Sequence, residues 1–315
     1  MTMVIIKVQM IIFDKKSGKM KRVSICIIVI FFIVISGCSH KSGENEIKVM
    51  TLNIRYDNPG DSIYTWPRRV QQICNFIKDE KPDILGMQGV LWNQYKVLDS
   101  VLTVYSSVGV GRDDGARQGE MNPVFFRKDR FDMVRNITFW LSDTPEIPGS
   151  KGWGASLPHI LTWLELVSKN SHKHFFCFNT HFAHDSDSAR LMSSKLLLKD
   201  INTIAEGFPF ILTGDFNMPP TSTGYSILTG PDESVPLLKD SYVITEKRPS
   251  GPTFTFNGFS DKLKTGRIDY VFVKNGMKVL DYRTIIKKEH GIYISDHWPV
   301  EAIVSINRSN KSSKL

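Results

Sequence analysis

A succession of short apolar segments, rich in β-branched and aromatic residues, constrains the fold of this chain more than any other feature of its sequence. The segments are IKVMTLNIR, ILGMQ, NPVFFR, ILTWLELV, HFFCFNTHF, FPFILTGDFN, GRIDYVFVK and HWPVEAIVSI, and each has the composition of a β-strand. Residues 66–80 and about 188–205 place apolar side chains at helical spacing; residues 81–83 would stop the first helix and Ser188 would cap the second. Strands that outnumber helices, and occur both in hairpin-like succession and around helices, predict an α/β or α+β layered domain.

Composition divides the chain into one domain and three flanking segments. We expect a leader at 1–38, a polar spacer at 39–46, a folded domain at 47–306 and a polar tail at 307–315. The domain shows no clear internal repeat, no low-complexity tract and no linker. Its Gly-, Pro- and Ser-rich stretches at 143–154 and 219–236 indicate long surface loops, which often border a functional site.

The leader has the pattern of an export signal. A basic start at residues 20–22 precedes an almost wholly apolar run at 23–35, which is short for a membrane span. The run ends in ISGC, which resembles a bacterial lipobox with Cys38 as the lipid-bearing residue. We therefore expect an exported bacterial lipoprotein, tethered at an outer or periplasm-facing membrane surface. The alternative is an uncleaved N-terminal anchor helix.

Net charge gives little evidence for a polyanionic partner. The formal charge is +8, but the leader carries six basic residues and one acidic residue, so the rest of the chain is only +3. Two cysteines remain outside the leader and Cys38. Cys74 and Cys177 each lie in an apolar segment, which favours two buried thiols over a disulfide.

Polar residues stand where apolar strands end, and there a rigid sheet can present catalytic groups to solvent. In ILTGDFN, Asp215 and Asn217 follow a buried strand two positions apart, so both side chains would share a face. A carboxylate there could bind a hard cation or activate water, and the amide could donate to a phosphate oxygen. A turn with an Asx cap is the alternative.

Three further segments carry candidate polar residues. Asp269 lies within the apolar strand GRIDYVFV, and burying it implies a partner. In SDHWPV, strand alternation would separate Asp296 from His297, leaving His297 free to meet Asp269 while Asp296 faces a metal or a phosphate. His181 in NTHFAH and Asn53 in TLNIR also end strands, although each alone is more often structural.

Taken together, TLNIR, LGMQ, NTH, GDFN, RIDYVFV and SDHWPV follow the order and rough spacing of the endonuclease/exonuclease/phosphatase superfamily. The resemblance covers about residues 47–306. The stretches GRDDGARQGE, NPVFFRKDRF and FWLSDTPEIPGSKGW resemble its bacterial exported branch, which is similar to nocturnin and deadenylase-type domains and to exonuclease III and DNase I. The resemblance implies a four-layer α/β sandwich of two packed mixed sheets flanked by helices, with the active site at one end of the sheets.

The resemblance also implies roles for single residues and a divalent metal, magnesium or manganese. Phosphoryl transfer builds negative charge that a cation and imidazolium donors offset. The implied roles are a water-activating Asp215, an orienting Asn217, metal-binding Asn53 and Asp296, a His297 oriented by Asp269, a phosphate-contacting or acidic His181, and Glu120 as the partner of His181.

The sequence departs from the family pattern at the principal metal ligand. The family strand ends in Gln-Glu, whereas here Gly89 follows Gln88. Gln88 cannot substitute, because strand alternation directs it to the other face. Loss of one anionic oxygen should weaken a hard-cation site, since magnesium is usually held by only one or two protein carboxylates. Ala183 and His159 also replace residues that relatives often carry as aspartate and arginine.

We therefore predict a monomeric, divalent-metal-dependent phosphoesterase with an impaired metal site. The substrate would be a phosphate ester, and the motifs favour a phosphodiesterase or nuclease of 3′-5′ exonuclease type, with nucleic acid as a candidate partner. Two alternatives stay open: a pseudoenzyme that binds phosphorylated ligands, and a phosphatase or sphingomyelinase-like lipid phosphoesterase.

Overall fold

The computed structural model of the protein describes residues 2–14, 18–31, 45–230, 237–262 and 266–306. The chain forms two compact units, Met1–Lys41 and Ser42–Leu315. In the first, β1 (Thr2–Asp14) and β2 (Lys19–Phe31) pair as an antiparallel hairpin, so the described part of the apolar run is a strand rather than an anchor helix. Cys38 and residues 307–315 lie outside the described residues. Among the helices described, none combines the length and apolar character that a membrane crossing requires.

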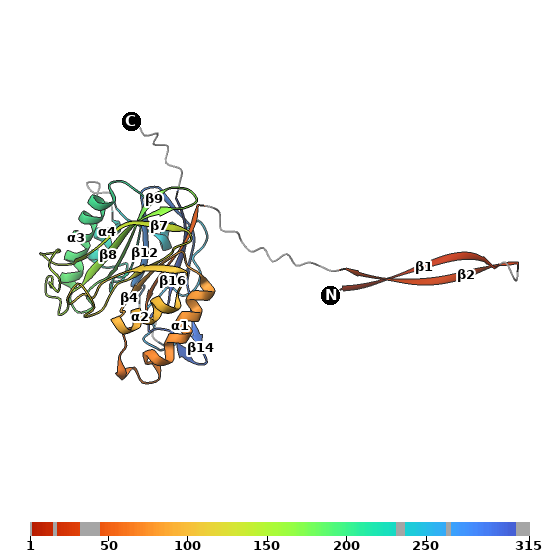
Figure 1. The fold of residues 1–315 in the computed structure, drawn as a ribbon, viewed down its shortest axis with the longest axis horizontal. Helices are drawn as coiled ribbons and strands as arrows, with labels where there is room; N and C mark the ends of the chain where they lie inside the picture. Colours follow the sequence, from red (N-terminus) through yellow and green to blue (C-terminus); the bar gives the residue numbers. More distant parts are fainter. Residues whose placement is uncertain (1, 15–17, 32–44, 231–236, 263–265, 307–315) are drawn as a thin grey trace, which may run out of the picture. The chain divides into compact units, whose positions relative to one another are not determined.

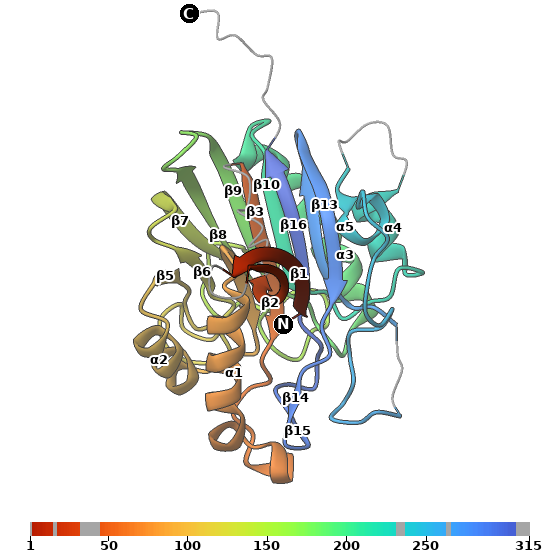
Figure 2. The same cartoon turned by 90° about the vertical axis from the view of Figure 1, so that its right-hand side faces the viewer.

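The second unit contains two six-stranded mixed sheets (Figures 1 and 2). The first sheet has the order β11-β12-β10-β9-β8-β7 and the second β13-β16-β3-β4-β6-β5. In each, one neighbouring pair is parallel, β9 with β10 and β3 with β4, and the other pairs are antiparallel. The strands of the first sheet are β7 (Phe131–Trp140), β8 (Ile160–Ser168), β9 (His174–His181), β10 (Phe210–Asp215), β11 (Lys239–Asp240) and β12 (Asp269–Lys274). Those of the second are β3 (Glu46–Asn53), β4 (Ile84–Gln88), β5 (Tyr105–Val108), β6 (Val124–Arg127), β13 (Met277–Thr284) and β16 (Val300–Ile306).

The outer faces of the sheets carry the helices α1 (Trp66–Glu80), α2 (Trp92–Val101), α3 (Asp187–Ala205) and α4 (Thr223–Thr229), and α5 (Ser241–Ile244) packs against the layer between the sheets. A further helix is η1 (Pro59–Tyr64), and a small hairpin, β14 (Lys288–Glu289) with β15 (Ile292–Tyr293), is separate from both sheets. Helices α1 and α2 pack on the second sheet, and α3 packs on the first (Figure 1). The predicted four-layer sandwich is therefore confirmed.

Burial on both faces explains why the strand segments are nearly all apolar. In β3, Val49 faces the layer between the sheets and Met50 faces α1. In β10, Ile211 faces the same central layer and Leu212 faces α3. Each strand of this kind removes both faces from water, and apolar burial is the main favourable contribution to folding.

A polar layer joins the two sheets below the ends of their central strands. The fully buried Asn179 donates to the carbonyl oxygens of Met87 and Pro123 at 2.7 and 3.0 Å, and its Oδ1 accepts from Gln88 and Thr213 at 2.6 and 3.0 Å. All four hydrogen-bonding positions of the Asn179 amide are satisfied, so this side chain can be buried at little cost and helps to fix the two sheets against each other.

Several local predictions are corrected. The second helix begins at Asp187, and Ser186 rather than Ser188 caps it, because the Ser186 hydroxyl accepts from the Ala189 N–H at 3.1 Å. The predicted loop 219–236 contains α4, and its residues 231–236 lie outside the described part of the chain. Helix α2 was not predicted. The thiols of Cys74 and Cys177 are free and buried, as expected.

Candidate active site

Asp215 is the centre of the site. It ends β10 and is almost fully buried, and parallel pairing with β9 places it opposite His181. Its Oδ2 accepts from the Asn53 amide across the two sheets at 2.9 Å, and lies 3.4 Å from Nε2 of His181 and 3.7 Å from Nε2 of His297. Predicted residues from four separate segments thus converge on one carboxylate oxygen.

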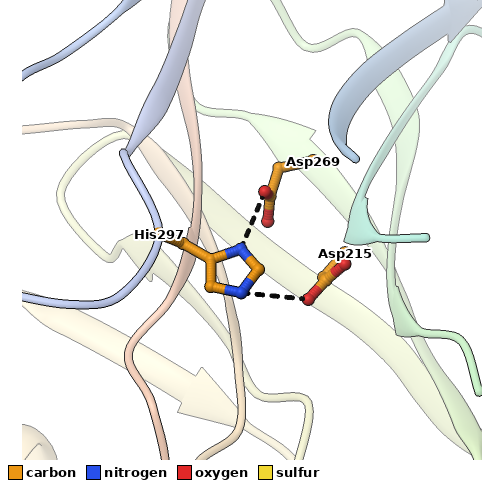
Figure 3. Close-up of side chains that lie close together, drawn as sticks. All are labelled: Asp215, Asp269 and His297. Carbon is orange, nitrogen blue, oxygen red and sulfur yellow. Dashed lines mark hydrogen bonds and ion pairs between the residues drawn. The ribbon is translucent and has the colours of Figure 1, made fainter. Parts of the chain in front are cut away.

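His297 and Asp269 form a buried pair, as the sequence predicted. The Nδ1 atom of His297 lies 2.9 Å from Oδ2 of Asp269, and the opposite ring nitrogen faces Asp215 (Figure 3). Burial alone would lower the pKa of His297, but the charges of Asp269 and Asp215 and the hydrogen bond to Asp269 raise it to about 10. The imidazole is therefore a cation at neutral pH; it donates to Asp269, and its Nε2 faces the Asp215 carboxylate at 3.7 Å.

The partnership expected between Glu120 and His181 is not a hydrogen bond in this structure. Oε2 of Glu120 lies 3.7 Å from Nδ1 of His181, and that nitrogen is buried without a hydrogen-bond partner. Glu120 instead pairs with Arg112 at 2.9 Å. Arg112 was not predicted from the sequence, because only the tertiary fold brings it to this carboxylate.

Asn217 reaches the pocket by a different route from the one predicted. The strand ends at Asp215, and Asn217 has a left-handed backbone with φ of 50°, so strand alternation does not place its side chain. Its amide donates to the carbonyl of Phe182 at 2.9 Å, and its backbone N–H donates to Oδ1 of Asp215 at 3.0 Å. Asn217 therefore fixes the orientation of the Asp215 carboxylate, and it also borders the pocket.

Asn53 and Asp296 lie on the side of the pocket that was assigned to the metal. Oδ1 of Asn53 accepts from the Arg55 backbone N–H at 2.9 Å. Asp296 accepts from Ser295 at 3.2 Å and lies 3.7 Å from the Arg55 guanidinium. Asp296 and His297 both line the pocket, contrary to the argument from strand alternation, because β16 begins only at Val300.

Gly89 borders the same side, and its backbone suits glycine. Its φ is +64°, and a Cβ added there would lie 2.9 Å from Oδ1 of Asn53. Gln88 is fully buried and donates to Thr51 and Asn179, so it does not reach the pocket. The prediction that Gln88 cannot replace the missing glutamate is confirmed.

Most residues of the candidate site line one cavity of about 690 Å³. The predicted residues that border it are Asn53, Gly89, Glu120, His181, Asp215, Asn217, Asp296 and His297. Asp269 lies behind His297. The lining residues that sequence reasoning missed include Arg55, Arg112, Leu157, His184 and Phe256. For Arg55 a signal existed, since it directly follows TLNI at a strand end.

Comparison with known proteins identifies the family. The model of the endonuclease/exonuclease/phosphatase family matches residues 50–297, which is most of the chain. The chain belongs to this family. It is 36% identical to the endonuclease/exonuclease/phosphatase structure from Bacteroides vulgatus, covering 83% of this chain and 99% of that one, with a TM-score of 0.79.

Two other family relatives carry names that state an activity. The mannosyl-6-phosphatase of Bacteroides thetaiotaomicron is 33% identical, with 82% of this chain and 100% of that chain covered and a TM-score of 0.76. A probable RNA exonuclease of Schizosaccharomyces pombe is 26% identical over 58% of this chain and 39% of its own length. The family thus includes hydrolases of both kinds.

Members of the endonuclease/exonuclease/phosphatase family typically depend on a divalent metal, and the residues present here fit one. Asp215, Asp269 and His297 offer ligand atoms within 4.8 Å of one another. Asp296 and Asn53 offer oxygen atoms only, as magnesium prefers. Gly89 adds no carboxylate, so Asp296 is the single anionic ligand of the oxygen set.

Proposed function

We propose that this protein hydrolyses a phosphate monoester carried by a small polar molecule, with sugar phosphates as the substrate class. The observation that carries the proposal is the convergence of Asn53, His181 and His297 on Oδ2 of Asp215, within 2.9 to 3.7 Å. A buried carboxylate surrounded by one amide and two imidazoles can orient a water molecule next to donors for a phosphoryl group.

Each group has a distinct role in the proposed reaction. Asp215 accepts a hydrogen bond from the attacking water and orients it. The His297 cation, held by Asp269 at 2.9 Å, donates from Nε2 to a phosphoryl oxygen on which negative charge develops. His181 contacts a second phosphoryl oxygen or protonates the leaving oxygen.

We assign the divalent cation to Asp296 and Asn53, because both offer oxygen atoms to the pocket and leave His297 to its hydrogen bond with Asp269. The bound cation supplies positive charge to the phosphoryl oxygens. With one carboxylate in this set, we expect a weakly held cation that the substrate phosphate helps to bind.

The pocket charges favour a small monoester over a nucleic acid. Arg55 pairs with Asp61 at 2.9 Å, and Arg112 pairs with Glu120 at 2.9 Å, so both lining arginines are already neutralised. A nucleic-acid enzyme gains affinity from cations that track successive phosphates. The 33% identity to a mannosyl-6-phosphatase over its full length supports the same class.

A 3′-5′ exonuclease-type phosphodiesterase is the second candidate. The similarity to a probable RNA exonuclease favours it, although this chain spans 39% of that protein. A pseudoenzyme remains the rival to both, and the absence of a carboxylate at Gly89 motivates it.

One comparative assay separates these candidates. The purified protein is given mannose 6-phosphate, other hexose phosphates, single-stranded RNA and DNA, phosphoinositides and sphingomyelin, each with magnesium, manganese or EDTA. We expect phosphate release from the sugar phosphates only, and its loss in Asp215→Asn and His297→Gln. Cleavage of RNA or DNA without sugar-phosphate hydrolysis would establish the second candidate, and phosphate binding without any turnover would establish the pseudoenzyme.

We also propose that the protein is a monomeric lipoprotein anchored through Cys38. The basic, apolar and ISGC pattern of the leader supports this proposal. Metabolic labelling with a radioactive fatty acid tests it, since the label should be lost in Cys38→Ala. Retention of the label in that variant would refute the anchor.

A further inference from the structure

A second hollow of about 480 Å³ adjoins the catalytic pocket. The two share Asn217, whose amide is fixed by the carbonyl of Phe182. The walls of the second hollow come from the start of α3, from the residues that follow β10 and from the start of α4. A ligand that extends past Asn217 from the catalytic pocket would therefore enter this hollow.

The charged groups of the hollow are not available to an anionic ligand. Arg190 pairs with Asp187, and its other terminal nitrogen donates to the carbonyl of Ala183 at 2.7 Å. The carboxylate of Asp187 is 98% exposed, and Asp185 lies two residues before it. A second phosphate in the hollow would find a cation already paired and the Asp187 carboxylate in the lining, so a polyanionic chain is disfavoured.

The rest of the lining combines hydroxyl groups with apolar surface. Ser188, Thr221 and Thr223 are exposed, whereas the Ser222 hydroxyl is occupied by the Tyr225 N–H at 3.2 Å. Leu191 and Pro219 supply the apolar part, and Met218 borders the hollow but is almost fully buried. Hydroxyl groups beside apolar carbon match the two kinds of surface that a sugar ring presents, and the volume accommodates one such unit.

We propose that this hollow, residues 187–191 together with 217–224, is a subsite for a neutral, hydroxyl-rich unit joined to the phosphorylated one. The physiological substrate would then be a phosphorylated oligosaccharide rather than a free hexose phosphate. This inference rests on the proposed sugar-phosphate hydrolysis and adds the size of the substrate.

The test compares kcat/KM for mannose 6-phosphate and for a mannose disaccharide phosphorylated at one 6-hydroxyl. We expect the wild type to prefer the disaccharide about tenfold, which one or two hydrogen bonds can supply. Thr221→Trp should fill the hollow and bring the ratio to about one. Thr203→Trp, an exposed threonine near the other end of α3, is the matched control and should keep the wild-type ratio. The subsite is overturned if the wild type shows no preference for the disaccharide. It is also overturned if Thr221→Trp keeps the same preference as the wild type.

A second measurement does not depend on turnover. With ¹³C-methyl methionine, the signal of Met218 should shift on titration with unphosphorylated mannose disaccharide in the wild type but not in Thr221→Trp. If neither phosphorylated sugar is hydrolysed, the proposed function fails, and the Met218 signal still decides the subsite. An unchanged signal in the wild type refutes it.

Discussion

The Nδ1 atom of His297 lies 2.9 Å from Oδ2 of Asp269, and both side chains are almost fully buried. The two residues are 28 positions apart in the chain, and the carboxylate ends up behind the imidazole as seen from the pocket. Asp269 therefore acts on the pocket through His297, and the charge state of His297 depends on it.

Replacing Asp269 by Asn tests that dependence. The amide keeps the shape but removes the charge that raises the His297 pKa to about 10. We expect kcat to fall about 100-fold at neutral pH, the scale of a lost general acid or charge stabiliser. In the wild type, activity should persist until the pH approaches 10, where His297 loses its proton; in the variant it should fall at lower pH. Asp281→Asn, which removes a surface partner of Lys247, is the control and should keep the wild-type kcat. An equal kcat in Asp269→Asn and the wild type would contradict the functional pairing of Asp269 with His297.

Because His159 is buried, we expect the folded protein to lose stability in acid. Burial lowers its pKa to about 3, well below the usual 6.5, so the unfolded chain binds a proton in that window and the folded chain does not. The free energy of unfolding should therefore decrease as the pH falls from about 6.5 towards 3, by up to about 1.4 kcal/mol per pH unit for this group.

Urea unfolding at pH 7.5 and 4.5 measures the effect. His159→Asn removes the titration and can still donate towards the carbonyl of His181, so its acid loss should be smaller than that of the wild type. His172→Asn, at an exposed position, should behave like the wild type. Identical acid losses in all three proteins would show that His159 does not control the effect.

Most of the fold followed from the sequence because burial on both faces gave the central strands an unmistakable apolar composition. Strand β4 was predicted with its observed bounds, as was α1. Helix α2 was missed because only Gln94 and Leu98 of its ten residues are buried, so its apolar pattern is weak. Local sequence patterns also predict side-chain directions better for residues within a strand than for residues just past its end. Asn217 and Asp296 reach the pocket through backbone turns that alternation does not describe.

The candidate site was predictable as a set of residues but not as a set of contacts. Asp215, His297 and Asp269 stand at strand ends or in an apolar strand, where burying a charged side chain is costly unless it has a partner. The roles of Arg55, Arg112 and Phe256 depend on segments that meet only after folding. Nothing in the local sequence of Glu120 indicates that Arg112 would bind it.

Gly89 yields a prediction about both stability and metal affinity. Its positive φ should make Gly89→Ala about 1 kcal/mol less stable, because an L-residue is strained in that conformation. Gly89→Glu should carry the same cost but bind magnesium about tenfold more tightly, since it adds a carboxylate beside Asp296. Calorimetry with the metal alone and urea unfolding measure the two effects. A Glu variant with unchanged magnesium affinity would show that the added carboxylate does not reach the cation.

Thr255 links the two segments that carry the catalytic pair. Its hydroxyl oxygen accepts from the backbone N–H groups of Ile268 and Asp269 at 3.0 and 3.1 Å, and its carbonyl accepts from Trp298 at 2.7 Å. The next residue, Phe256, pairs with His297 through a β-bridge, and their rings are 5.0 Å apart. Thr255 is thus a positioning residue for the distance between Asp269 and His297.

We expect Thr255→Val to lower kcat about tenfold with little change in KM, because the pair loses its alignment while the pocket lining stays. It should also cost about 1–3 kcal/mol of stability, since the buried N–H of Asp269 and the partly buried N–H of Ile268 lose their acceptor. Thr255→Ser keeps the hydroxyl and should restore kcat. Thr213→Val removes another buried hydroxyl, whose single proton faces the Phe178 carbonyl and Oδ1 of Asn179, and should cost stability without lowering kcat. If both valine variants lose kcat in proportion to stability, Thr255 has only a structural role.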